Sequence, residues 1–159
     1  MTGITSLENL MHWIDRFADA GVRGITICDT TGMANPSQVQ AVCEAAQSKY
    51  PQLQWTLHFH NTRGMGLANA LAAVNSGIDR FDSSLGGLGG CPYAPGATGN
   101  ICTEELVHML DLMGFNTNMN IDTLLTCSKD LQSLIGRQLP SQLLMAGKVD
   151  KLHMAPCQA

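Results

Sequence analysis

Positive charge is scarce in this chain, and the little that is present is scattered. The 159 residues include 9 Lys and Arg against 13 Asp and Glu, which gives a formal net charge of −4 at pH 7. The sequence therefore lacks the basic patch or stripe that binds nucleic acid, and we expect no nucleic-acid partner. Any anionic ligand would have to be held by a few individually positioned side chains and by backbone N–H groups.

Long hydrophobic runs and a secretory leader are also missing. No stretch approaches the ~20 apolar residues of a membrane-spanning helix, and the opening MTGITSLENLMHW has neither a basic nor an apolar signal region. We therefore expect no membrane association. With 45% hydrophobic and 14% charged residues, the composition indicates one soluble globular domain rather than a disordered chain.

Cysteine is present, but not in a pattern that indicates disulfides or a zinc ribbon. No two of the six cysteines form a C-x-x-C pair, and six are too few here to predict a disulfide scaffold. Reduced thiols and a cytoplasmic location are the expectation. The cysteines are Cys28, Cys43, Cys91, Cys102, Cys127 and Cys157.

The apolar pattern alternates between the helix period and short β-branched runs. An amphipathic helix over 6–20, capped by Ser6, is followed three times by a strand and then a helix. This order predicts an α/β fold with parallel strands. Three strands make a small sheet, and a (β/α)₈ barrel takes ~250 residues, so the chain reads as part of a larger architecture. The predicted strands are GITICDT, QWTLHFHN and IDRFDSSL, and helices are also predicted from Thr103, at 121–135 and at 140–147.

His58 and His60 lie two apart on the second predicted strand and so share one face. Two imidazoles presented together can bind a divalent metal, although a hydrogen-bonded pair at a strand end is the alternative. Asp29 ends the preceding strand, and Asp82 and Ser84 lie near the end of the next. Sites in parallel α/β folds form at these carboxyl ends, but Asp29 can equally bond its own turn.

A loop of unusual composition, GGLGGCPYAPGATGN, follows the third strand at 86–100 and holds six glycines around Cys91. Glycines let a ligand approach closely and let a loop act as a lid. The Cys91 thiol is either reactive there or an inert packing group. Asn100 ends the loop as a helix cap or as a cation ligand. Arg63, the basic residue near the histidines, meets an anionic group or is solvated.

Four segments of the chain together resemble the 3-hydroxy-3-methylglutaryl-CoA lyases, a family of metal-dependent TIM-barrel enzymes. They are DTTGMANP, HFHNTRGMGLAN, DSSLGGLGGCPYAPGATGN and TEELVHML. The resemblance implies the last three strand–helix units of a (β/α)₈ barrel at 1–115, including the lid loop 86–100, and a C-terminal helical extension at 116–159.

The resemblance also implies a site and a reaction. His58, His60 and Asn100 would bind Mg²⁺ or Mn²⁺, with Cys91 and Asp29 as catalytic residues. The reaction would be retro-Claisen cleavage of 3-hydroxy-3-methylglutaryl-CoA to acetyl-CoA and acetoacetate. The expected small-molecule partner is an acyl-CoA substrate. The expected oligomeric state is a homodimer.

The family's Arg-Asp pair, on its first strand, has no counterpart here, so the chain would act as part of a larger enzyme. The alternatives are a related condensing or aldol-type enzyme acting on acyl-CoA and 2-oxo acids, an inactive truncated fragment, and a non-catalytic metal- or CoA-binding module.

Overall fold

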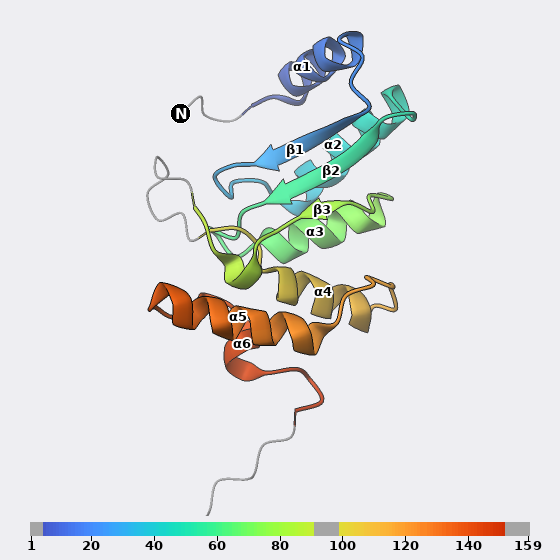
Figure 1. Ribbon diagram of the computed structural model, residues 1–159. Helices are drawn as coiled ribbons and strands as arrows, with labels where there is room; N and C mark the ends of the chain where they lie inside the picture. The colour runs from blue at the N-terminus through green and yellow to red at the C-terminus, as the bar shows by residue number, and fades with distance from the viewer. Residues whose placement is uncertain (1–4, 91–98, 152–159) are drawn as a thin grey trace, which may run out of the picture.

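The computed structural model describes residues 5–90 and 99–151, which form a three-stranded sheet with helices on one side and at one end (Figure 1). Strands and helices alternate through the first part, and three helices follow the third strand. The elements are α1 (Leu7–Asp19), β1 (Gly24–Asp29), α2 (Pro36–Lys49), β2 (Gln54–Phe59), α3 (Gly66–Asn75), β3 (Phe81–Asp82), the 3₁₀ turn η1 (Leu85–Gly87), α4 (Thr103–Leu112), α5 (Ile121–Ile135) and α6 (Gln142–Ala146).

Local sequence signals set where the helices begin. The Ser6 side chain accepts a hydrogen bond from the Asn9 N–H at 3.1 Å, which starts α1 as predicted. Asn35 and Gln38 form a reciprocal capping box at the start of α2, with Pro36 at the first helical position. These caps therefore set where α1 and α2 begin.

All three strands are parallel, in the order β1-β2-β3, which confirms the predicted α/β class. Their two faces differ in character. Trp55, Leu57 and Phe59 of β2 are buried against α2 and α3, which lie behind the sheet in Figure 1. Within the described residues, no helix covers the opposite face. This face carries polar side chains in two rows across the strands: Thr26 beside Thr56, and Cys28, His58 and Asp82 side by side.

The third strand is much shorter than the sequence predicts. The pattern of IDRFDSSL predicts a strand across 78–85, but β3 pairs with β2 only at Phe81 and Asp82. Beyond that point the chain returning from the glycine-rich loop takes over the edge of β2, since the Ile101 N–H donates to the Phe59 carbonyl at 3.1 Å. Ser84 then bonds to this returning segment rather than to β2, because its N–H donates to the Ile101 carbonyl.

A buried carboxylate joins two of the last helices to the turn that follows β3. Glu104 on α4 is fully buried, and it accepts hydrogen bonds from the Gly86 N–H at 3.0 Å and from the Ser128 hydroxyl at 3.1 Å. It therefore joins α4, η1 and α5 at the base of the glycine-rich loop. The predicted division at 115/116 stays a prediction. Among the described residues, no helix is both long and apolar enough to span a bilayer.

We predict that Glu104→Ala lowers the free energy of unfolding by about 1–3 kcal/mol, because it leaves two buried donors without an acceptor. Urea unfolding followed by circular dichroism measures the loss. Glu44→Ala is the matched control, since Glu44 is exposed on α2 and bonds only to Gln40 on the same helix. Equal stabilities for the two variants would contradict the structural role of Glu104.

Candidate functional site

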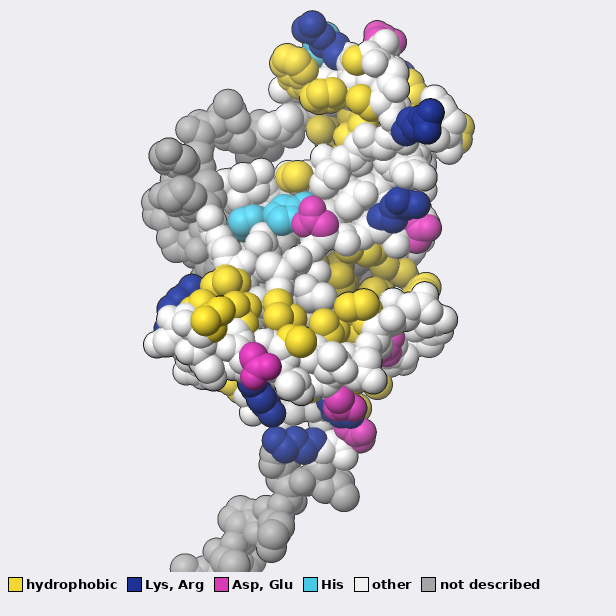
Figure 2. Space-filling view, viewed as in Figure 1, with side chains coloured by type: hydrophobic (Ala, Val, Ile, Leu, Met, Phe, Trp, Pro, Cys, Tyr) yellow, Lys and Arg dark blue, Asp and Glu magenta, His cyan; other side chains and the backbone are white. Residues whose placement is uncertain are grey.

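The two histidines of β2 lie together at the end of that strand, on the open face of the sheet. Their ring centroids are 5.1 Å apart and the rings meet edge to face at 64°. The His60 residue is buried, at 7% exposed, whereas the His58 side chain is 20% exposed. Figure 2 shows histidine side chains at the centre of this face, with hydrophobic side chains gathered over α1 and over α5 on either side.

Asn100 is brought to the same place by backbone pairing. It forms an antiparallel bridge directly opposite His60, and residues on both sides of the bridge are bonded. The Asn61 N–H donates to the Gly99 carbonyl at 3.0 Å, and the Ile101 N–H donates to Phe59. Side chains directly opposite in an antiparallel pair share a face and lie close together. The structure thus brings His58, His60 and Asn100 together.

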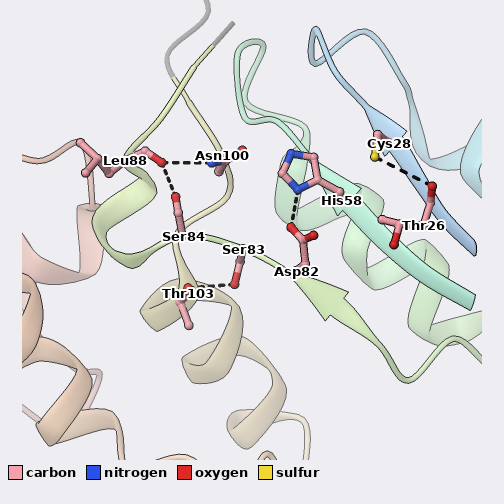
Figure 3. Close-up of polar contacts among 9 residues, drawn as sticks. All are labelled: Thr26, Cys28, His58, Asp82, Ser83, Ser84, Leu88, Asn100 and Thr103. Atoms are coloured by element: carbon pink, nitrogen blue, oxygen red, sulfur yellow. Dashed lines mark hydrogen bonds and ion pairs between the residues drawn. The ribbon is translucent and has the colours of Figure 1, made fainter.

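The amide of Asn100 is fixed by one of its two polar atoms. Its Nδ2 donates to the Leu88 carbonyl at 3.0 Å, and the Ser84 hydroxyl donates to the same carbonyl at 2.5 Å (Figure 3). The amide nitrogen is thereby committed to the loop, and Oδ1 is the atom left to accept. Because the NH₂ group of an amide donates hydrogen bonds and its oxygen accepts them, the bond to Leu88 identifies the other atom as the oxygen, which can serve as a ligand.

Two buried polar atoms in this group have no hydrogen-bond partner among residues 5–90 and 99–151: Nδ1 of His60 and Oδ1 of Asn100. Buried polar atoms in folded proteins are almost always satisfied, so an unpaired imidazole nitrogen beside an unpaired amide oxygen needs an explanation. Both atoms are ordinary ligands of divalent cations. The residues present therefore fit a cation.

The charge state of His60 suits a ligand. Burial lowers the pKa of His60, and the neighbouring His58 lowers it further, while Asp29 acts in the opposite direction. The lowered pKa favours the neutral imidazole, which is the form that binds metals. In the described part of the chain, no three His, Cys, Asp or Glu side chains are placed to hold an ion, so the set depends on the Asn100 amide.

Asp82 contacts His58 in a way that the sequence did not reveal. Its Oδ1 meets Nδ1 of His58 across the β2–β3 pairing, where the two residues are in register (Figure 3). The positions of both residues near strand ends were the available signal. Which residues of two parallel strands face each other depends on the intervening crossover, so the sequence pattern left the pairing open.

Asp29 and Arg63 hold the loops next to the histidines. The Asp29 carboxylate accepts hydrogen bonds from the backbone N–H of Met33 at 2.9 Å and of Ala34 at 3.2 Å. Arg63 donates to the carbonyls of Thr31 and Gly32, which joins the loop after β2 to the loop after β1. Asp29 thus bonds its own turn, the alternative that the sequence allowed, and its catalytic role stays a prediction.

Cys91 lies outside the described residues, so its predicted role as a catalytic thiol stays a prediction too. The loop that carries it leaves and re-enters the fold beside the histidines. The Gly87 and Gly89 carbonyls on the outgoing side lie against Gly99 on the returning side. The two described ends of this loop, Gly89 and Gly99, therefore lie next to Asn100.

Several known proteins similar to this chain are named as lyases of hydroxymethylglutaryl-CoA or citramalyl-CoA. Residues 1–131 match the family model described as HMGL-like. The hydroxymethylglutaryl-CoA lyase of Bacillus subtilis is 43% identical over 142 residues, which cover 89% of this chain and 48% of that protein. The (R)-citramalyl-CoA lyase of Chloroflexus aurantiacus is 43% identical over 156 residues, which cover 97% of this chain and 49% of that protein.

A solved structure agrees with the fold. An HMG-CoA lyase from Acinetobacter baumannii, in complex with coenzyme A and 3-methylmalate, matches with a TM-score of 0.91 at 47% identity. The match covers 98% of this chain and 51% of that one. The predicted fold, a portion of a (β/α)₈ barrel followed by helices, is confirmed. The chain spans about half the length of the relatives it matches.

We predict that Gly99→Ala disrupts the position of Asn100. Gly99 has φ +111, and an added Cβ would lie 2.2 Å from the Gly89 carbonyl oxygen and 2.3 Å from that of Gly87. Urea unfolding should show a loss of more than about 1 kcal/mol. Gly21→Ala is the control, because Gly21 has φ +82 but open space around its added Cβ. A loss no larger than in this control would contradict the close approach.

Proposed function

The chain belongs to the HMGL-like family, and on that premise we propose that it forms the C-terminal part of a divalent-metal-dependent carbon–carbon lyase. The substrate would be 3-hydroxy-3-methylglutaryl-CoA, cleaved to acetyl-CoA and acetoacetate. The observation that carries the proposal is the meeting of His58, His60 and Asn100 around two unsatisfied buried ligand atoms.

These three residues would hold the cation, Mg²⁺ or Mn²⁺, through imidazole nitrogens and an amide oxygen. When bound, such a cation polarises substrate oxygens and lowers the pKa of a bound hydroxyl group. All three protein ligands are uncharged, so they neutralise none of its charge. Asp29 and Asp82 lie at the ends of the neighbouring strands, and both are already engaged with this chain's own atoms.

The proton balance of the reaction assigns tasks to the remaining residues. A base takes the proton of the 3-hydroxyl group, the bond between C2 and C3 breaks, and the electron pair of that bond passes to the thioester enolate. C2 then gains a proton and becomes the methyl group of acetyl-CoA. We assign that proton donation to Cys91, whose loop is tied to the site at both ends. Asp29, held by two N–H groups, would act as a fixed negative charge at the end of β1.

The open face of the sheet supports action within a larger enzyme. The chain contributes three described strands, whereas a closed barrel of this type has eight. Histidine and acidic side chains lie side by side on this face in Figure 2, where a closed barrel would enclose them. We therefore propose that further strands complete the site and supply the charge that His58, His60 and Asn100 lack. A homodimer and a cytoplasmic location stay predictions.

A citramalyl-CoA is the second candidate substrate. The Chloroflexus aurantiacus enzyme that acts on it is as similar to this chain as the Bacillus subtilis enzyme is, and the match covers more of the chain. Cleavage assays with both thioesters, on the chain within a complete barrel, would separate the two. Faster turnover of citramalyl-CoA would replace the first candidate, and turnover of neither would contradict both.

We predict that the chain binds Mn²⁺ and that His60→Ala and Asn100→Ala each weaken binding more than about tenfold. Calorimetric titration measures the affinity. His12→Ala is the control, because His12 is exposed on α1, away from the strand ends. Equal Mn²⁺ affinities for the unaltered chain and the two site variants would contradict the proposed metal site.

A further inference from the structure

His58 and Asp82 face each other across neighbouring parallel strands at the open face of the sheet. The register pairs their Cα positions, and Nδ1 of His58 contacts Oδ1 of Asp82 (Figure 3). We propose that Asp82 is a positioning residue, which holds His58 in the tautomer that presents its Nε2 lone pair to a cation. The inference rests on the proposed metal site and names a residue that the site needs beyond its ligands.

The chemistry of the contact selects one tautomer. A carboxylate only accepts hydrogen bonds, so the hydrogen between the two side chains resides on Nδ1 of His58. In a neutral imidazole the other nitrogen, Nε2, then carries the lone pair. Histidines that bind metals commonly donate their second nitrogen to a carboxylate, which fixes the ring and makes it a stronger base. Asp82 is placed to do this for His58.

The backbone makes the contact specific. β3 is only two residues long, and one of its two pairings with β2 is the pairing of Asp82 with His58. The sheet thus holds the two Cα positions together at the point where the carboxylate is used. His60 differs from His58, because it faces Asn100 and its Nδ1 has no acceptor among residues 5–90 and 99–151. The carboxylate therefore serves one of the two imidazoles.

Cys28 completes the row on the other side of His58. It is in register with His58 on β1, and its thiol is directed at the Thr26 carbonyl, 4.0 Å away (Figure 3). Burial raises the pKa of the Cys28 thiol, and the charge of Asp82 raises it further. Soft thiol ligands select ions such as Cu(I) and Zn²⁺ rather than Mg²⁺ or Mn²⁺, so Cys28 is not a competing ligand for the proposed cation. The imidazole is the ligand of this row, and Asp82 is its support.

The tautomer can be measured directly on the metal-free chain. Long-range ¹H–¹⁵N correlation NMR at about pH 8, where a histidine is ordinarily neutral, distinguishes the two nitrogens of His58. We expect His58 to carry its hydrogen on Nδ1, and Asp82→Ala to shift it toward Nε2. Asp79→Ala is the control, since Asp79 is an exposed carboxylate three residues away that pairs with Arg80. An Nε2–H tautomer in the unaltered chain would overturn the inference, whatever the variants do.

A second readout tests the consequence for the cation. Asp82→Ala should weaken Mn²⁺ binding about 10–100-fold, and Asp79→Ala should leave it unchanged. A weaker Mn²⁺ affinity in Asp82→Ala with no change of tautomer would make Asp82 a ligand and overturn the positioning role. The Nδ1–H tautomer in a chain that binds no Mn²⁺ would instead overturn the metal site of the proposed function. The two failures are therefore distinguishable.

Discussion

The return of the chain to the edge of β2 is the contact on which the candidate site depends. The parallel sheet alone places His58 and His60 at a strand end, but it offers them no third ligand. The antiparallel bridge between His60 and Asn100 supplies one, and the Asn61 and Ile101 bonds on either side keep it in register. The antiparallel pairing thus places Asn100, which follows the glycine-rich loop in the sequence, next to the histidines of the parallel sheet.

Much of the fold follows from short-range signals, and the parts that do not are those set by distant pairing. The caps at Ser6 and Asn35 act within one turn of helix, so the sequence predicts these helix starts correctly. The shared face of His58 and His60 follows from strand geometry alone. The length of β3 does not, because the partner that displaces it from β2 is Ile101, far along the chain. Contact between Asp82 and His58 was equally hidden, since it needs the register of two strands.

The glycines at the base of the loop have a structural reason that composition does not disclose. Where the loop leaves and returns, backbone packs on backbone: the carbonyls of Gly87 and Gly89 lie where a side chain at Gly99 would be. Gly86, with φ +63, similarly leaves room for Leu139 from the segment before α6. The missing side chain at Gly99 thus allows a close backbone contact, and the one at Gly86 allows a close contact with the Leu139 side chain.

The arrangement of α2 and α3 has a consequence for how such a chain is made. Both helices lie next in sequence to the strands they cover, and the main hydrophobic cluster draws on α1, α2, β2, α3 and α4 of this one polypeptide. Nearest-neighbour contacts of this kind form quickly and early, unit by unit, during synthesis. The hydrophobic face of the sheet would therefore be covered by the helices of this same chain, without help from the remaining barrel strands. The polar face of the sheet and the outer edges of β1 and β3 would remain available to pair with the other strands of the barrel.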